Sequence, residues 1–202
     1  MFPENYFIYI QLIIFYFITP GPPRVVIVSN TINYGLRKSV WTAFGDISAN
    51  FVQASLVTFV IGSLLIDNPG VYLYLKWAGI LYLLFLAYET LALKIKKADI
   101  KNKVFKSNLL MFRDGFLVAG LSPKALVFFG TIFLTFINFE KNVISQFLIL
   151  ISTWMILDFF SLMIYGLAAR KVALWLKGNP RTLNTISACV LIIIALYVGI
   201  KT

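Results

Sequence analysis

The stretch Thr19-Pro20-Gly21-Pro22-Pro23-Arg24 interrupts an apolar segment that runs from Tyr6 to Ser29. Proline has no amide hydrogen and clashes with the preceding helical turn, and glycine frees the backbone, so the sequence predicts a broken helix here. In a bilayer, unpaired backbone groups and a buried arginine each cost several kcal/mol unless protein or a water-filled cavity satisfies them. A broken, charged helix therefore predicts a binding site or a transport path.

A second break follows one hundred residues later. Gly120-Leu121-Ser122-Pro123-Lys124 interrupts the apolar run Gly115–Ile137, and its Pro123-Lys124 echoes Pro23-Arg24. Interrupted apolar segments at matching positions of two halves are typical of the binding site of a transporter. Two proline kinks that only shape helix packing are the alternative.

The composition indicates an integral membrane protein. Of 202 residues, 60% are hydrophobic and only 13% are charged, whereas soluble domains carry about 25% charged residues. The net charge of +10 resides mainly in loops, so we expect no nucleic-acid partner. With one cysteine and no histidine, the chain lacks the residue types of a disulfide, a catalytic triad or a transition-metal site. We therefore expect neither an enzyme nor a cofactor.

Six apolar segments are long enough to cross a bilayer, and none alternates in the manner of a membrane β-strand. The sequence thus predicts an all-α membrane protein with six transmembrane helices, of which the first and fourth are broken at Pro20–Pro23 and Pro123. The predicted segments are Tyr6–Ser29, Val40–Ile66, Val71–Leu93, Gly115–Ile137, Val143–Ala168 and Leu183–Ile200.

The loop charges predict an orientation. Thirteen of the eighteen cations fall in or beside the first, third and fifth loops, which the positive-inside rule places in the cytoplasm, with both termini outside. Glu4 is the only charge before Arg24, so we expect no cleaved signal peptide. The lysine-rich loop at 94–112 separates two three-helix halves, 1–93 and 113–202, of one membrane domain. Since three is odd, the halves enter from opposite sides, as in an inverted repeat.

Four charged residues are predicted inside the membrane: Arg24, Lys124, and the acids Asp46 and Asp158 on the second helix of each half. The acids are candidate proton carriers, or they form fixed ion pairs that hold helices together. Asn50 extends the polar face of Asp46 by one turn, and Gln53 by two. A further acid, Asp114, is expected at the N-terminus of the fourth helix, where it favours the helix dipole.

The order of these motifs resembles the lysine exporter (LysE/RhtB-type) family of bacterial amino-acid efflux proteins. The resemblance covers nearly the whole chain. It rests on Pro20-Gly21-Pro22, then Gly35 with Arg37-Lys38, Gly45, Lys76-Trp77-Ala78-Gly79, and Ser122-Pro123-Lys124-Ala125.

This resemblance implies two inverted three-helix repeats, often as a homodimer, in the bacterial inner membrane. It also implies export of amino acids or close derivatives, driven by the proton gradient. The chain departs from the family where Pro23 and Arg24 follow Pro-Gly-Pro in place of an acidic or amide residue and an asparagine, and where Ser122 replaces asparagine. An arginine at that point would hold a substrate carboxylate or neutralise Asp46.

The resulting hypothesis is a proton antiporter that binds an amino acid at the midplane and alternates its access. Backbone amides around Pro20–Arg24 and Ser122–Lys124 would hold the carboxylate. Asp46 or Asp158 would hold the ammonium or the proton. Export of an inorganic cation or another small metabolite is the alternative. The predicted site consists of Pro20, Gly21, Pro22, Arg24, Asp46, Asn50, Ser122, Pro123, Lys124 and Asp158.

Overall fold

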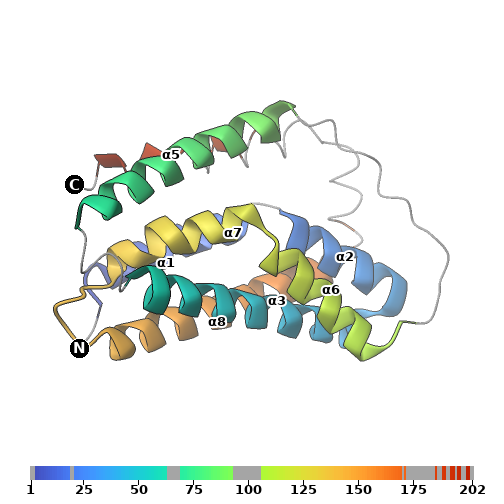
Figure 1. The fold of residues 1–202 in the computed structure, drawn as a ribbon. Coiled ribbons are helices and arrows are strands. Elements are labelled where there is room, and N and C mark those ends of the chain that lie inside the picture. Colours follow the sequence, from blue (N-terminus) through green and yellow to red (C-terminus); the bar gives the residue numbers. More distant parts are fainter. Residues whose placement is uncertain are drawn as a thin grey trace.

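The computed structural model describes residues 3–18, 21–62, 69–92 and 106–169, and separate positions between 171 and 200. Every regular element in this part of the chain is helical, which confirms the predicted all-α class. The α-helices are α1 (Tyr6–Ile18), α2 (Pro22–Tyr34), α3 (Leu36–Leu56), α5 (Pro69–Ala92), α6 (Asn108–Gly120), α7 (Pro123–Val127) and α8 (Val143–Leu167) (Figure 1).

Short segments of other helical type extend two of these helices. A π-helical turn, Val57–Ile61, continues α3, and a second one, Phe128–Phe133, continues α7. A 3₁₀ turn, Leu134–Phe136, ends the latter run. In Figure 1, α5 lies along one side of the molecule, whereas α3 and α8 pack together on the other.

The described residues contain two to four candidate membrane spans. Two helices are long and apolar enough by themselves, namely Leu36–Ile61 and Val143–Leu167, with 26 and 25 residues. Two bent pairs qualify when each is taken as one span: α1 with α2, at 54°, and α6 with Lys124–Phe136, at 56°. Helix α5 coincides with the third predicted segment, and most of the sixth lies outside the described residues.

The two bends lie where the sequence predicts them. Helix α1 ends at Ile18, and α2 begins at Pro22, the first of two prolines in its opening turn. Helix α6 ends at Gly120, and α7 begins at Pro123. Proline is well accommodated in the first turn of a helix, where its missing amide hydrogen has no intrahelical acceptor. The prolines therefore start the second half of each broken helix.

The start of the fourth predicted helix needs a correction. Helix α6 begins at Asn108, so residues 108–112, predicted as loop, are its first turns. Ser107 caps the helix, because its Oγ accepts a hydrogen bond of 3.3 Å from the Leu110 amide. Asp114 thus lies well inside α6 instead of at its N-terminus, and it pairs with Lys106. The polar residues before Gly115 hid this helix start.

Helices α3 and α6 touch backbone to backbone through two glycines. A Cβ atom on Gly45 would lie 2.0 Å from the carbonyl oxygen of Phe112, and one on Gly115 would lie 2.0 Å from that of Thr42. No side chain fits at either position. This contact joins the first half of the chain to the second and brings Asp46, the residue after Gly45, close to the bend between α6 and α7.

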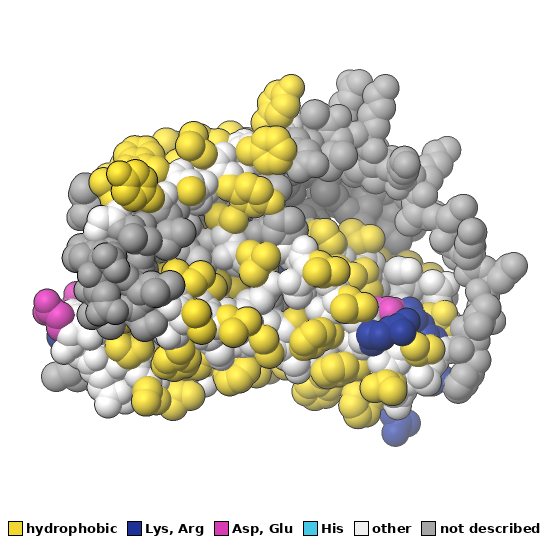
Figure 2. Space-filling model, in the orientation of Figure 1, with side chains coloured by type: hydrophobic (Ala, Val, Ile, Leu, Met, Phe, Trp, Pro, Cys, Tyr) yellow, Lys and Arg dark blue, Asp and Glu magenta, His cyan; other side chains and the backbone are white. Residues whose placement is uncertain are grey.

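The surface is mostly apolar, as a bilayer requires. Figure 2 shows hydrophobic side chains over most of the visible face and Lys and Arg side chains near the end where α3 and α6 begin. Large exposed hydrophobic residues occur on several helices, including Phe7, Leu81, Leu109 and Leu167. Such wide apolar exposure is unusual for a soluble monomer and typical of a surface that faces lipid.

Candidate functional site

A cavity lies where the two bends meet, between α1, α2, α3, α6, α7 and α8. Eight of the ten predicted site residues line it: Gly21, Pro22, Arg24, Asp46, Asn50, Ser122, Lys124 and Asp158. Of the other two, Pro20 lies outside the described residues, and Pro123 begins α7 without a described side-chain position. The volume open to the centre of a water molecule in this cavity is about 20 Å³. That is room for about one water.

Arg24 and Asp158 form a buried ion pair across the cavity. The Arg24 guanidinium Nη2 donates to Asp158 Oδ1 at 2.5 Å, and the two side chains are 6% and 0% exposed. The guanidinium carbon also lies 5.0 Å from the centre of the Phe17 ring, a cation–π contact. Arg24 therefore pairs with the acid of the second half. Of the two acids, α8 presents Asp158 to the arginine of α2, and the contact with Asp46 on α3 is indirect, through Asn50 and Asp158.

Asn50 links the two acids. Its Nδ2 donates to Asp46 Oδ2 at 2.9 Å and to Asp158 Oδ2 at 3.0 Å. The two carboxyl groups are therefore neighbours, with a single arginine in direct contact with one of them. If both acids are ionised, this group of three charges has a net charge of −1, which a proton or a bound cation would balance.

Lys124 lies apart from this group, against Tyr16. Its Nζ is 4.0 Å from the centre of the Tyr16 ring and 3.5 Å from the Tyr16 carbonyl oxygen. Within the described part of the chain Lys124 forms no ion pair. Its charge is thus stabilised by a ring and a carbonyl, and it faces the same cavity as Asp46.

Three cavity-lining side chains carry buried polar atoms that have no hydrogen-bond partner among the described residues. They are Asp46 Oδ1, Arg24 Nε and Trp154 Nε1. A buried polar atom without a partner costs about 1–3 kcal/mol, so a site with one acceptor and two donors in this state is unfavourable until a ligand or water satisfies them. The arrangement provides one acceptor for a cation and two donors for an anion.

Side chains from neighbouring helices satisfy carbonyl groups at both bends. Gln53 of α3 donates to the carbonyls of Ala119 and Gly120, at 3.4 and 2.8 Å, where α6 ends. Tyr165 of α8 donates to the Ile18 carbonyl at 2.7 Å, where α1 ends. Each donor follows the buried acid of its own helix by seven residues, which is two helical turns. Each half of the chain thus caps the broken helix of the other.

The backbone offers few free amides at the bends. Pro22 and Pro23, the first residues of α2, have no amide hydrogen, and the Val25 amide donates to the Gly21 carbonyl at 3.1 Å. At the second bend, the amides of Ala125 and Leu126 both donate to the Ser122 carbonyl. An anion in the cavity would therefore depend on side chains more than the sequence led us to expect.

Sequence reasoning missed the aromatic wall of the cavity. Tyr16 and Trp154 line it, and Trp154 packs against Phe128 and Phe129, with ring centres 4.6 and 4.8 Å away. In an apolar segment such residues look like ordinary core. A signal did exist, since Trp154 precedes Asp158 by four residues and thus shares its helical face.

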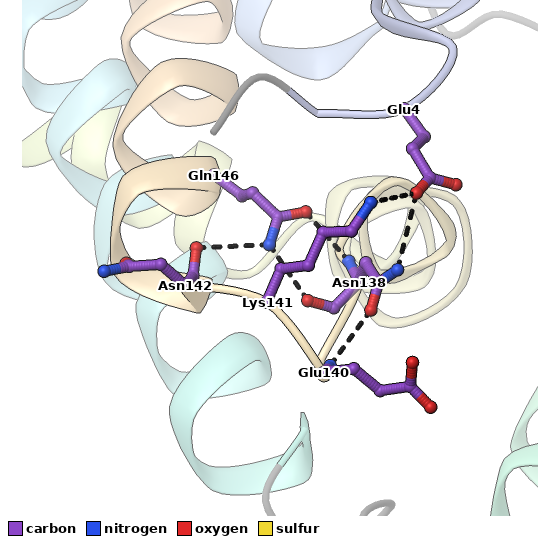
Figure 3. A network of polar contacts seen from close by, with 6 residues as sticks. All are labelled: Glu4, Asn138, Glu140, Lys141, Asn142 and Gln146. Atoms are coloured by element: carbon purple, nitrogen blue, oxygen red, sulfur yellow. Dashed lines mark hydrogen bonds and ion pairs between the residues drawn. The ribbon is translucent and has the colours of Figure 1, made fainter.

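A second polar network lies far from the cavity, where α1 begins and α8 begins (Figure 3). Lys141 Nζ donates to Glu4 Oε1 at 2.7 Å, and the Asn138 side chain donates to the same oxygen at 3.4 Å. Gln146 of α8 binds the Asn138 backbone twice, at 2.9 Å each, and also donates to the Asn142 carbonyl at 3.1 Å. This network ties the N-terminal residues to the loop before α8.

Among the described residues, no three His, Cys, Asp or Glu side chains gather as metal ligands. The cavity that holds the two acids also holds Arg24, whose positive charge would repel a divalent cation.

Comparisons with known proteins agree with these features. The family model described as LysE type translocator matches residues 14–202. A homoserine/homoserine lactone efflux protein of Salmonella typhimurium (strain LT2) is 26% identical over 186 residues, covering 91% of this chain and 89% of that protein. A leucine efflux protein of Enterobacter sp. (strain 638) is 23% identical over 179 residues, covering 88% and 85%. No solved structure matches the chain.

Proposed function

Because this chain belongs to the LysE type translocator family, whose members are membrane transporters and not enzymes, we propose that it exports a small amino acid or a close derivative by proton antiport with alternating access. The export of homoserine, its lactone or leucine is what the names of its relatives give for those proteins. One observation carries the proposal for this chain. The cavity at the two bends brings together two cations and two acids from both halves.

The charges of the cavity match those of an amino acid. An α-amino acid carries an ammonium and a carboxylate a few ångströms apart. The cavity has carboxylates at Asp46 and Asp158 and cations at Arg24 and Lys124. Lys124 is half-buried, and the other three side chains are buried. Burying a zwitterion is favourable only where each of its charges meets an opposite one.

The size of the cavity supports alternating access. Space for about one water is too small for an amino acid, so substrate binding requires the walls to separate. The walls belong to different halves, with α2 and α3 on one side and α6, α7 and α8 on the other. The reciprocal caps by Gln53 and Tyr165 support a two-fold relation between the halves. Rocking of one half against the other would open the cavity to each side of the membrane in turn.

The distribution of charge supports an orientation with both termini outside. Arg37 and Lys38 stand at the start of α3, and Lys106 and Arg113 stand around the start of α6. Figure 2 shows Lys and Arg side chains near the end of the molecule where these two helices begin. Glu4 belongs to the opposite end, where α1 begins. Cytoplasmic loops of membrane proteins are rich in Lys and Arg, so the basic end would face the cytoplasm.

Counterflow in proteoliposomes tests the proposal. The purified protein is reconstituted, the vesicles are loaded with unlabelled homoserine, leucine or lysine, and uptake of the labelled compound is followed. We expect uptake of at least one neutral amino acid, accelerated when the lumen is acidic and slowed again by a protonophore. Empty liposomes are the control.

Three outcomes would contradict the proposal. If the folded protein gives no counterflow with any amino acid, amino acids are excluded as its substrates. Net uptake into vesicles without internal substrate that does not respond to an acidic lumen rules out antiport. Transport of Mn²⁺ without an amino-acid response would favour the cation exporter instead.

A further inference from the structure

The four charged residues of the cavity are not equivalent, and the difference lies in their partners. Arg24 and Asp158 are bonded to each other at 2.5 Å. Asp46 has one carboxylate oxygen on Asn50 and the other, Oδ1, without a hydrogen-bond partner among the described residues. Lys124 has no ion-pair partner in the same part of the chain. Arg24 and Asp158 are thus a closed pair, bonded to each other, whereas neither Asp46 nor Lys124 forms an ion pair among the described residues.

The reciprocal contacts of the two halves make this asymmetry informative. Arg24 follows the first bend and pairs with the acid on the second helix of the other half. By the same relation, Lys124, which follows the second bend, is expected to pair with Asp46. It stacks on Tyr16 instead, with its Nζ 4.0 Å from the ring centre. The cavity that both residues line lies at this unmade contact.

We infer that Asp46 and Lys124 hold the two charged ends of the substrate, whereas Arg24 and Asp158 neutralise each other and position Asp46 through Asn50. This assignment rests on the proposed function and deepens it. The substrate ammonium binds Asp46 Oδ1, and its carboxylate binds Lys124. The indole N–H of Trp154 is buried at the cavity wall without a partner among the described residues, and it is placed to donate a second hydrogen bond to the carboxylate.

The assignment also specifies the substrate class. Once Asp46 and Lys124 are bound to the ammonium and carboxylate, no uncompensated charge lines the cavity. A substrate whose side chain is itself charged would bury that charge without a partner, which costs several kcal/mol. The wall offers the small residues Gly21, Ala119, Ser122 and Ala125 instead. The site is therefore selective for neutral amino acids and rejects lysine and glutamate.

Sharing of Asp46 explains antiport without a second site. The protonated Asp46 carboxyl gives up its proton when the substrate ammonium binds, so that the products are an ammonium–carboxylate pair and one released proton. The groups around this carboxyl are Asp158 on α8, Arg24 on α2, Tyr16 on α1, Lys124 on α7 and Asn50 on its own helix. At this cavity α6 contributes Ala119 and no charge. Proton and substrate then exclude each other.

Functional-group deletion separates the two charged ends. The probes are leucine, 4-methylpentanoate, which lacks the ammonium, and 3-methylbutylamine, which lacks the carboxylate; homoserine, 4-hydroxybutanoate and 3-amino-1-propanol form a matched second series. Affinities are measured by calorimetry on the full chain in nanodiscs. In the unmodified protein each deletion weakens binding by about 10–150-fold, as for the loss of a charge-assisted hydrogen bond.

The variants assign each loss to a residue. In Asp46→Asn, removal of the ammonium carries no further loss. In Lys124→Met, the loss on removal of the carboxylate shrinks to the part that the Trp154 hydrogen bond contributes. The double variant Arg24→Met/Asp158→Leu, which removes the closed pair together, keeps the full carboxylate loss. It keeps part of the ammonium loss, because Asp46 remains but Asn50 no longer ties it to Asp158. Size-exclusion profiles and thermal unfolding of each variant verify that it is folded. A Trp154→Phe variant weakens binding of the carboxylate-bearing probes but leaves 3-methylbutylamine unaffected.

Proton release gives an independent readout. Leucine binding to the unmodified protein, measured in buffers of different ionisation enthalpy, releases a proton, and the Asp46→Asn variant releases none. If the carboxylate loss is abolished by Arg24→Met instead of Lys124→Met, or the ammonium loss by Asp158→Asn instead of Asp46→Asn, the assignment is overturned while the proposed function stands. If the unmodified protein neither binds nor exchanges any amino acid, the proposed function itself fails.

Discussion

Two ion pairs join the first half of the chain to the second, in opposite surroundings. Arg24 and Asp158 are 2.5 Å apart, with side chains 6% and 0% exposed, whereas Lys141 and Glu4 are 2.7 Å apart, with side chains 40% and 61% exposed (Figure 3). The contact distances are alike, but the exposure of the side chains to solvent differs. An exposed pair contributes about 0–1 kcal/mol, whereas removal of one partner of a buried pair costs about 3–5 kcal/mol.

The buried pair is not there for stability alone. Taking both charges out of water costs several kcal/mol each, and well-packed apolar residues often replace such a pair without loss. Its value lies in what it does to its neighbours. Through Asn50 it fixes the position of Asp46, and it adds no net charge to the cavity. The exposed pair has no such neighbours and ties only the chain end to a loop.

The largest effect is expected from breaking the buried pair on one side. Arg24→Met leaves Asp158 and Asp46 as adjacent acids, linked by Asn50, with no arginine bonded to either. We expect a loss of about 3–5 kcal/mol of unfolding free energy, seen as a fall in the thermal midpoint of roughly 6–20 °C. Thermal unfolding of the purified protein in detergent measures this.

The matched control removes both charges. Arg24→Met/Asp158→Leu is expected to recover most of the lost stability, because no unpaired charge remains buried. A double variant that is less stable than Arg24→Met alone would show that the pair stabilises the fold directly, and not only by positioning Asp46.

A second prediction concerns the backbone contact that holds the buried cluster in place. A Cβ atom at Gly45 would lie 2.0 Å from the Phe112 carbonyl oxygen, so Gly45→Ala must push α3 away from α6. Overpacking of this kind costs about 1–3 kcal/mol. Gly130→Ala is the control, since a Cβ there meets nothing within 4 Å. In a helix it is expected to be neutral or to stabilise by up to about 1 kcal/mol. Equal losses in both variants would refute a role for close packing at Gly45.

Buried and more exposed caps at the two bends provide a third test. Gln53→Leu leaves the Ala119 and Gly120 carbonyls without this donor in a buried setting, and we expect a loss of about 1–3 kcal/mol. Tyr165→Phe removes one hydrogen bond to Ile18 from a partly exposed side chain and is expected to cost about 0.5–1.5 kcal/mol. Chemical unfolding of both variants measures the difference. A larger loss in Tyr165→Phe would reverse the ranking by burial.

The sequence predicted the bends and the charged residues well because both depend on local chemistry. Proline and glycine end a helix wherever they stand, and a charge inside an apolar run has few tolerable places. The bends at 18–22 and 120–123 follow directly. So does the gathering of Arg24, Asp46 and Asp158 around one cavity, since each must meet a polar partner inside the molecule.

The pairing among those charges was beyond the sequence. Whether Arg24 meets Asp46 or Asp158 depends on how α2, α3 and α8 are rotated about their axes, and that is set by packing over the whole molecule. The backbone contact at Gly45 is one such constraint. Trp154 was missed for another reason. Its spacing of four residues from Asp158 was the available signal, but an aromatic residue in an apolar helix looks like ordinary core.

The smallest effect is expected at the exposed pair. Lys141→Gln removes the ion pair with Glu4 but leaves Asn138 and Gln146 to hold the loop before α8. We expect a loss of unfolding free energy below about 1 kcal/mol, because the pair is exposed to solvent. The loss becomes smaller still in about 0.5 M salt, because salt screens the two charges. Unfolding at low and high salt measures the loss under both conditions.

Counterflow of the Lys141→Gln variant gives the sharper result. If transport stays at the unmodified level, this end of the molecule opens without breaking a strong contact. A large change in transport with little change in stability would instead mean that the Glu4–Lys141 contact controls the opening of the cavity to this side. Glu4 and Lys141 would then form a gate, whereas Arg24 and Asp158 belong to the binding site.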